Sequence, residues 1–555
     1  MSLIPITSVP LRGQVRKTAA QKSHLVFSAA APTLGVDSRQ ALANSDTQTA
    51  ISIDNMFARS FGLEMRAGYT QYANLSPANA VTLMTYTNHT IDAGTSRFFV
   101  AADDGKVYDI TSYTPDNVTP TEVLDVPGQI RSGECYWLNF VTAAGNFLCV
   151  VFPGAGYYTY NDTAGWVEHI AGTAAGEIDG ADPTTFGFIY VWKNRLFFVQ
   201  DGTSTVYYLP TQTLTGAVSP FEFGSMFPHG GEMAYGGTWT VDSGSGLNDM
   251  MVVISSEGDL LLYEGTDPND ISTFALNGRW YVGHVPDGRR FATPYGADMA
   301  LISERGLLLM TDILRGTDTM PQNEAAARIN QLLQPDVRAS IHTRYWEIKM
   351  LTDVNILAIN APQLRLNTGY IWALDMTAFG ASKMTNFPFT NLEMYDGISY
   401  AADNAGRVWK LWQGSKDGYI GETTPGAGDE VVGKDIEAYV QTAFVPLGEP
   451  FRWKRFILVR AGFRSLAAPA ARMALNPEWT FAQPLAAPTY VETGTSLWDA
   501  DDWNYGIWSG STQTFKVWVG AQGMGHFASL AMRVRGRPKT VFIDWDCVVE
   551  AGGIL

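Results

Sequence analysis

A chain of 555 residues with 46% hydrophobic and only 17% charged residues can bury a large interior, which excludes an intrinsically disordered protein. Its length exceeds what one ordinary core supports, so we expect two or more domains. The net charge of −17 at pH 7 excludes a protein that grips nucleic acid through a surplus of Lys and Arg. The negative charge can be interpreted in two ways: it keeps the protein soluble, or it forms a channel surface along which DNA passes without binding. Composition does not distinguish between them.

The residue types favour an all-β protein. The 54 Gly and the many aromatic residues are typical of short strands joined by turns. The three cysteines, Cys135, Cys149 and Cys547, show no CxxC spacing, which argues against a disulfide framework and a structural zinc site. We find no secretory signal at the N-terminus and no apolar stretch near the roughly 20 residues that cross a bilayer. We therefore expect a soluble protein, made in the cytoplasm, without a membrane span.

Residues 1–75 are predicted to form an extended N-terminal arm and the first strands. The stretch 28–49 is polar, small and weakly periodic, which is typical of a segment draped over a surface. Residues 51–57 and 62–69 alternate between apolar and polar side chains and are predicted to be strands.

From residue 76 to 415 a hairpin recurs, in which a strand, a glycine turn and a second apolar strand follow one another. The turns fall about 50 residues apart, a spacing in the range of propeller blades. They are marked by Gly105, Gly154, Gly202, Gly258, Gly306, Gly369 (a poorer copy) and Gly406. One hairpin cannot bury its own apolar face, but a ring of about six or seven can, so we predict a β-propeller. Unrelated hairpins in a β-sandwich remain the alternative.

One segment inside this region, near 321–346, is predicted to be a small helical insertion. Residues 323–333 are rich in helix formers, and Pro335 is expected to end the helix. Residues 337–346 are expected to form a second short helix. The insertion would decorate the rim or the bottom of the propeller.

Residues 416–433, rich in Gly, Pro, Thr and acidic residues, are predicted to be a linker. A C-terminal β domain is predicted over 434–555, with strands near 436–440, 456–460, 514–519 and 540–545.

No catalytic, cofactor-binding or metal-ligating residue is predicted. The sequence lacks a glycine-rich phosphate-binding loop, an HExxH helix and a Gly-x-Ser-x-Gly elbow. The seven histidines show no pair at ligand spacing, so each is interpreted as a hydrogen-bonded structural residue. They are His24, His89, His169, His229, His284, His342 and His526.

Two acidic clusters require a closer look, because many propellers hydrolyse glycans with paired carboxylates. Asp499, Asp501 and Asp502 lie among Trp498, Trp503 and Trp508 and could form a sugar platform or a calcium loop. The segment lacks the Gly and the terminal Glu of an EF-hand loop. A polar turn beside aromatic anchors is the favoured interpretation, and residues 267–270 are predicted to be a turn as well.

Several passages together resemble the tail nozzle proteins of short-tailed bacteriophages, also called tail tubular or tail stabilisation proteins. Near the N-terminus, Asn55 and Phe57 are followed by Arg66, Gly68 and Tyr69, similar to the opening motif of that family. The resemblance spans most of the chain and is strongest from about 190 to 310. Its further passages are 192–199, 207–210, 236–244, 255–268, 496–499, Trp503 and 508–510 before Phe515.

The resemblance implies a structural protein of the virion tail, assembled in the host cytoplasm, and not an enzyme. It implies a hexameric ring below the portal and its adaptor, a conduit for ejected DNA, with tail fibres or spikes docked outside. The family's known parts are surfaces, so no individual residue is assigned a role. The N-terminal arm and the C-terminal β domain are candidate interfaces, and acidic side chains are expected to face the lumen.

Two alternatives remain open. A receptor- or glycan-binding propeller predicts an exposed groove lined by Trp side chains. A glycan-degrading tail propeller predicts two facing carboxylates in one pocket.

Overall fold

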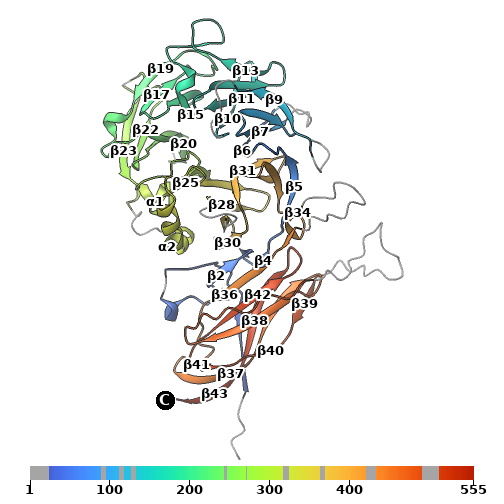
Figure 1. The fold of residues 1–555 in the computed structure, drawn as a ribbon. Helices are drawn as coiled ribbons and strands as arrows, with labels where there is room; N and C mark the ends of the chain where they lie inside the picture. The colour runs from blue at the N-terminus through green and yellow to red at the C-terminus, as the bar shows by residue number, and fades with distance from the viewer. Residues whose placement is uncertain are drawn as a thin grey trace, which may run out of the picture.

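The computed structural model describes residues 24–39, 41–88, 96–111, 118–126, 133–242, 247–270, 272–316, 324–362, 369–419, 433–490 and 512–554. Figure 1 shows an elongated, mostly β molecule with a ring of sheets above a narrower β domain that carries the C-terminus. We call this narrower part, made of strands β1 to β4 and β36 to β43, the lower domain. Within the described residues, no helix combines the length and apolarity needed to span a bilayer.

The upper part is a β-propeller, which confirms the predicted fold class. Six sets of four antiparallel strands, counted over the described residues, stand around a common centre. The first two blades are β6 (Ala80–Tyr86), β7 (Arg97–Ala102), β8 (Lys106–Asp109) and β9 (Thr121–Asp125), then β10 (Tyr136–Thr142), β11 (Gly145–Phe152), β12 (Gly156–Asn161) and β13 (Gly165–His169). The next two are β15 (Phe186–Trp192), β16 (Arg195–Gln200), β17 (Thr205–Tyr208) and β19 (Ser219–Glu222), then β20 (Met233–Asp242), β21 (Leu247–Ser255), β22 (Asp259–Glu264) and β23 (Ala275–Tyr281).

The last two blades connect the propeller to segments from elsewhere in the chain. One contains β27 (Glu347–Leu351), β28 (Ile356–Ala361), β29 (Tyr370–Asp375) and β30 (Ala381–Thr385). The other contains β31 (Phe389–Tyr395), β32 (Ile398–Asp403), β33 (Arg407–Leu411) and β5 (Tyr69–Asn74). Because β5 precedes the first blade in the sequence and pairs with β33 of the last, it closes the ring.

A three-stranded sheet and two helices stand between the fourth blade and the β27 blade. The sheet contains β24 (Ala292–Tyr295), β25 (Asp298–Ser303) and β26 (Gly306–Leu309), and α1 (Met310–Leu314) follows it directly. Helix α2 (Glu324–Ala339) packs against β26, where a fourth strand would lie in an ordinary blade.

The helix boundaries were predicted wrongly. Helix α2 passes through Pro335 and ends at Ala339, and no second helix follows, since the chain turns and enters β27 after Trp346. A proline inside a helix costs about 3 kcal/mol. Ile329, Leu333 and Val337 lie on one face of α2 and are fully buried, and this burial outweighs that cost.

The predicted hairpin repeat is confirmed, and its glycines occupy one equivalent position. Each stands at the turn between the second and third strand of its sheet, which needs a backbone that glycine adopts readily. The φ angles are 84° at Gly105, 80° at Gly154, 68° at Gly202, 91° at Gly258, 96° at Gly306 and 77° at Gly406. Gly369 ends the corresponding loop between β28 and β29.

The lower domain contains two sheets whose buried side chains belong to one core. One sheet combines β1 (His24–Ala30), β3 (Met56–Arg59) and β4 (Gly62–Met65) with β37 (Arg452–Ser465), β39 (Gln513–Lys516), β40 (Val519–Gly520), β41 (Met524–Gly525) and β43 (Val541–Ile554). The other combines β2 (Ala50–Asp54), β36 (Ala438–Thr442), β38 (Ala470–Pro477) and β42 (Ala528–Arg535). The described part of the predicted arm and first strands therefore lies largely in the lower domain.

One sheet runs without a break from the propeller into the lower domain. Strand β30 of a blade pairs with β2 of the lower domain through Asp54 and Lys383, which gives an eight-stranded sheet from β27 to β38. At the start of the predicted linker, Lys416–Tyr419 form strand β34, which pairs with β5. Residues 420–432 lie outside the described residues.

Candidate functional site: the propeller axis and the junction below it

The junction between the propeller and the lower domain is built around the buried side chain of Arg66. Its guanidinium donates to both carboxylate oxygens of Asp417, at 2.6 and 2.7 Å, and its Nε donates to Asn55 Oδ1 at 2.9 Å. Asn55 in turn donates to Thr385 Oγ1 and to the carbonyl oxygen of Glu437. One network therefore ties the N-terminal strands, a blade, β34 and the lower domain together.

Gly68 and Tyr69 complete this junction. A Cβ atom at Gly68 would lie 1.8 Å from the carbonyl oxygen of Lys416, so only glycine lets the two segments approach. The Tyr69 hydroxyl donates to the carbonyl oxygen of Asn386, and burial raises the pKa of this phenol. Residues of the opening motif thus hold the fold together at one place.

A polar cavity of about 320 Å³ opens beside this network and carries charges of both signs. Burial raises the pKa of Asp54 in its wall to about 6, although Lys383 and Arg533 lie nearby and lower it. Arg533 donates to Glu437 at 2.9 Å, and Arg535 lies 3.3 Å from the same carboxylate. Most charges of this cavity are therefore paired within the chain.

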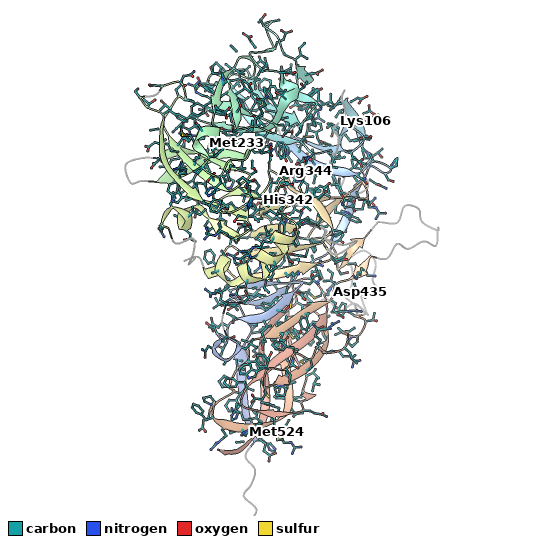
Figure 2. All side chains as sticks on the ribbon, turned by 60° about the vertical axis from the view of Figure 1, so that its left-hand side comes forward. Lys106, Met233, His342, Arg344, Asp435 and Met524 are labelled. Carbon is teal, nitrogen blue, oxygen red and sulfur yellow. The ribbon has the colours of Figure 1, made fainter. Side chains whose placement is uncertain are left out.

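A second cavity, of about 240 Å³, lies at the centre of the propeller. Its wall comes from the innermost strands of successive blades, with Tyr136, Phe188 and Tyr235 among the aromatic side chains. Figure 2 places Arg344 beside the opening at the propeller centre. Side chains fill most of the axis, and a small organic molecule fits what is left.

Two glutamates in this cavity bridge neighbouring blades. Glu347 accepts hydrogen bonds from Asn391 Nδ2 and from the backbone N–H of Leu392, both at 2.8 Å. Glu393 forms an ion pair with Lys349 at 2.7 Å and accepts from the Met394 N–H. Burial raises the pKa of Glu347 to about 7, although Arg290 and Lys349 lower it. No sequence pattern marks these residues, because an acidic residue in a strand has no local feature that shows whether it will be buried.

Of the two acidic clusters considered in the sequence, only the one at residues 267–270 lies within the described residues. Asp499, Asp501, Asp502 and the tryptophans around them lie outside the described residues. Residues 267–270 form the predicted turn, closed by a hydrogen bond from the Asp270 N–H to the Asp267 carbonyl, and Asp267 pairs with Arg195 at 2.7 Å. Over the described residues, no group of three or more His, Cys, Asp or Glu side chains could hold a metal ion.

Among the described histidines, His169 has the buried, hydrogen-bonded surroundings that were predicted, whereas His229, His284 and His342 lie beside carboxylates with side chains that are 52%, 47% and 88% exposed. His169 shares a hydrogen bond with Thr159 and another with the Gly176 carbonyl, and burial lowers its pKa. The three cysteines are buried and free, and burial raises the pKa of each thiol to about 12.

The negative charge is concentrated in the second, third and fourth blades. Residues 133–281, which span these blades, contain 16 Asp and Glu against three basic residues, Lys193, Arg195 and Arg279, a difference of −13. Glu168, Asp179 and Glu222 are among the exposed members of this set. We call these three blades the acidic sector.

The lower domain exposes large apolar side chains. Phe451 is 80% exposed, Val26 60% and Met524 63%, and Figure 2 shows Met524 near the lower tip. Exposed apolar side chains such as Ile170 also occur on the propeller, but the most exposed ones lie on the lower domain, and a surface rich in them is typical of a contact with another protein.

Comparisons with known proteins do not name a family. No family model and no curated protein matches the chain. Among solved structures, the computationally designed Ika8 protein is 12% identical, with a TM-score of 0.34, over 62% of this chain and 99% of that one. BBS1N in complex with ARL6DN is 12% identical, with a TM-score of 0.26, over 42% of this chain and 66% of that one. Likenesses this low carry no argument about function.

Proposed function

We propose that this chain is the subunit of a ring-shaped tail nozzle of a short-tailed bacteriophage, a structural virion protein through which DNA is ejected. The proposal begins from the resemblance of its sequence passages to that family. The observation that carries it furthest is the junction, where Asn55, Arg66, Gly68 and Tyr69 of the opening motif bind the propeller rigidly to the lower domain. A closed ring needs subunits of fixed shape, because each contact must recur at the same angle.

In this proposal the DNA passes between subunits and not through a propeller. The axial cavity of about 240 Å³ is far too small for a duplex whose major groove alone is about 12 Å wide. The acidic sector would face the lumen, since a wall with few Lys and Arg side chains releases few counterions from DNA and so does not hold it. The exposed apolar side chains of the lower domain would contact neighbouring copies or other tail proteins.

The partners in this proposal are five further copies of the chain, the portal-adaptor above the ring, and fibres or spikes outside it. The test is native mass spectrometry and electron microscopy of the purified chain, alone and with the neighbouring tail proteins. A stable six-membered ring with an acidic lumen is expected. A lone monomer that cleaves capsule, or a ring with a basic lumen, would refute the proposal.

A second candidate function is that of a glycan-binding or glycan-degrading tail propeller. Glu347 and Glu393 share the axial cavity with Trp137 and Tyr136, and the pKa of Glu347 near 7 suits an acid catalyst. Against it, the hydrogen bonds and ion pair described above already engage both carboxylates. Cleavage of capsule glycan that is lost in both Glu347→Gln and Glu393→Gln would favour this function over the nozzle.

A further inference from the structure

The guanidinium of Arg290 is only partly used by the protein. Its Nη2 donates to Thr82 Oγ1 at 2.6 Å and to the Cys135 carbonyl at 3.4 Å. Within the described residues, its Nε and Nη1 make no hydrogen bond, although a guanidinium carries five N–H donors. Arg290 lines the axial cavity, so these donors are available to a molecule bound there.

The other two cations of the cavity are engaged. Arg289 donates to the Met233 carbonyl at 2.7 Å and to Asp201 at 3.0 Å, and Lys349 is paired with Glu393. The oxygens of Glu347 accept from Asn391 and Leu392, so this carboxylate gives Arg290 its charge but no hydrogen bond. Arg290 is therefore the cation that a ligand can reach.

The ion pairs around the cavity single out Arg290. Asp201 pairs with Arg289 and Glu393 pairs with Lys349, which leaves Glu347 as the carboxylate nearest to Arg290, and within the described residues no hydrogen bond joins these two. A buried charge is stable when it is both paired and hydrogen-bonded, and the unused donors of Arg290 lack the hydrogen bonds. A carboxylate supplies two acceptors with a single negative charge, whereas phosphate, with about two negative charges, would be repelled more strongly by Glu347 and Glu393.

The remaining wall suits a compact organic body. Trp137 lies under the Lys349 ammonium, with 5.9 Å from Nζ to the ring centre, and Phe188 lies under Arg289 at 5.8 Å. Aromatic walls with a few fixed polar groups are the usual composition of small-molecule sites.

We propose that the axial cavity of the propeller binds one small organic carboxylate, whose two oxygens accept hydrogen bonds from the free donors of Arg290. The planar guanidinium matches the planar carboxylate, and such charge-assisted bonds are among the stronger hydrogen bonds in proteins. This site does not depend on the proposed ring of six subunits, because one subunit contains all of its residues.

The test is calorimetric titration of the purified chain with glucuronate, with neutral glucose and inorganic phosphate as parallel probes. Saturable binding of glucuronate at least tenfold tighter than that of either probe is expected. Arg290→Gln should lower the glucuronate affinity at least tenfold and Arg290→Lys less, while Arg472→Gln, on the lower domain, should leave it unchanged. Equal binding of glucose or phosphate, no saturation by glucuronate, or an unchanged affinity of Arg290→Gln would overturn the proposal.

Crystals of the unaltered chain soaked in 4-bromobenzoate, whose aryl bromine is not displaced by protein nucleophiles, give a measurement that needs no variant. Anomalous density for bromine in the axial cavity, with the carboxylate at Arg290, is expected. Bromine found only at other places would refute the site even if the Arg290 variants did not fold.

Discussion

Arg66 and Asp417, 351 residues apart in the chain, form a bidentate ion pair whose side chains are 0% and 3% exposed. The pair is shielded from water, so each charge depends on the other and on its hydrogen bonds. Asn55 and Asn386 supply two of those bonds, and the Phe387 ring lies 4.5 Å from the guanidinium carbon.

Replacing Arg66 with Ala should lower the free energy of unfolding by about 3–5 kcal/mol, because Asp417 is left charged and buried. Arg66→Lys keeps the charge but loses the two-pronged geometry, so we expect a smaller loss. Denaturant unfolding followed by tryptophan fluorescence measures both variants. The matched control is Lys106→Ala, which removes the exposed pair with Glu122 and should leave stability unchanged. Equal effects of Arg66→Ala and Lys106→Ala would contradict a structural role for the buried pair.

Gly68→Ala should prevent the chain from accumulating in folded form. The added methyl group would overlap the Lys416 carbonyl oxygen, and both segments belong to paired strands or lie next to them. Gly520→Ala is the control, because a Cβ there meets no atom within 4 Å. Soluble yield and melting temperature are the measurements. A Gly68→Ala protein that melts like the Gly520→Ala protein would show that the two segments can move apart at little cost.

The buried carboxyl of Glu347 should make stability fall as pH rises. Its pKa of about 7 lies above the unfolded value near 4.3, so the folded state holds the proton over that interval. The favourable contribution is complete below about pH 4 and is lost as pH rises through 7, by about 4 kcal/mol in all. Arg290, Lys349, Glu393 and the Leu392 N–H face this carboxyl, and Glu347→Gln keeps them in place.

The measurement for Glu347 is the difference in unfolding free energy between Glu347→Gln and the unaltered chain at several pH values. We expect the unfolding free energy of Glu347→Gln to rise relative to that of the unaltered chain between pH 5 and pH 8. A difference that stays constant across this range would show that the carboxyl does not change its proton there.

Phe451→Glu should weaken contacts between subunits without unfolding the chain. Phe451 is 80% exposed on the lower domain, so a charge there costs little in the isolated subunit but is costly in an apolar contact. Phe379→Glu is the matched change on the propeller, where the side chain is 47% exposed. Native mass spectrometry should show fewer assembled rings for Phe451→Glu but not for Phe379→Glu. The melting temperatures of both variants should be unchanged. If the Phe451 variant still forms rings, Phe451 does not take part in the contact between subunits.

The blades could be predicted from the sequence because each repeats the same local event. Gly105 and Gly406 lie 301 residues apart, yet each marks the turn between the second and third strand of its blade. Turn chemistry is local, and it does not depend on what packs against it. The helix that passes through Pro335 could not be predicted, since its stability comes from the packing of Leu333 and Val337 and not from helix propensity.

The sites were less predictable than the blades. Arg66 and Asp417 come together only in the folded chain, and no local sequence pattern around either residue predicts that they pair. The axial cavity gathers Glu347 and Glu393 from two different sheets and Arg290 from the segment before β24, so its chemistry exists only after the blades have closed into the propeller.

The pairing of β5 with β33, and of β1 and β4 with β43, sets the order in which the nascent chain can finish folding. These N-terminal strands leave the ribosome first, but their partners lie at residues 407–411 and 541–554, so they wait for most of translation to end. A prematurely terminated chain would therefore carry open strand edges, which join readily to other chains. Incomplete copies would then be removed by aggregation or proteolysis instead of joining an assembly.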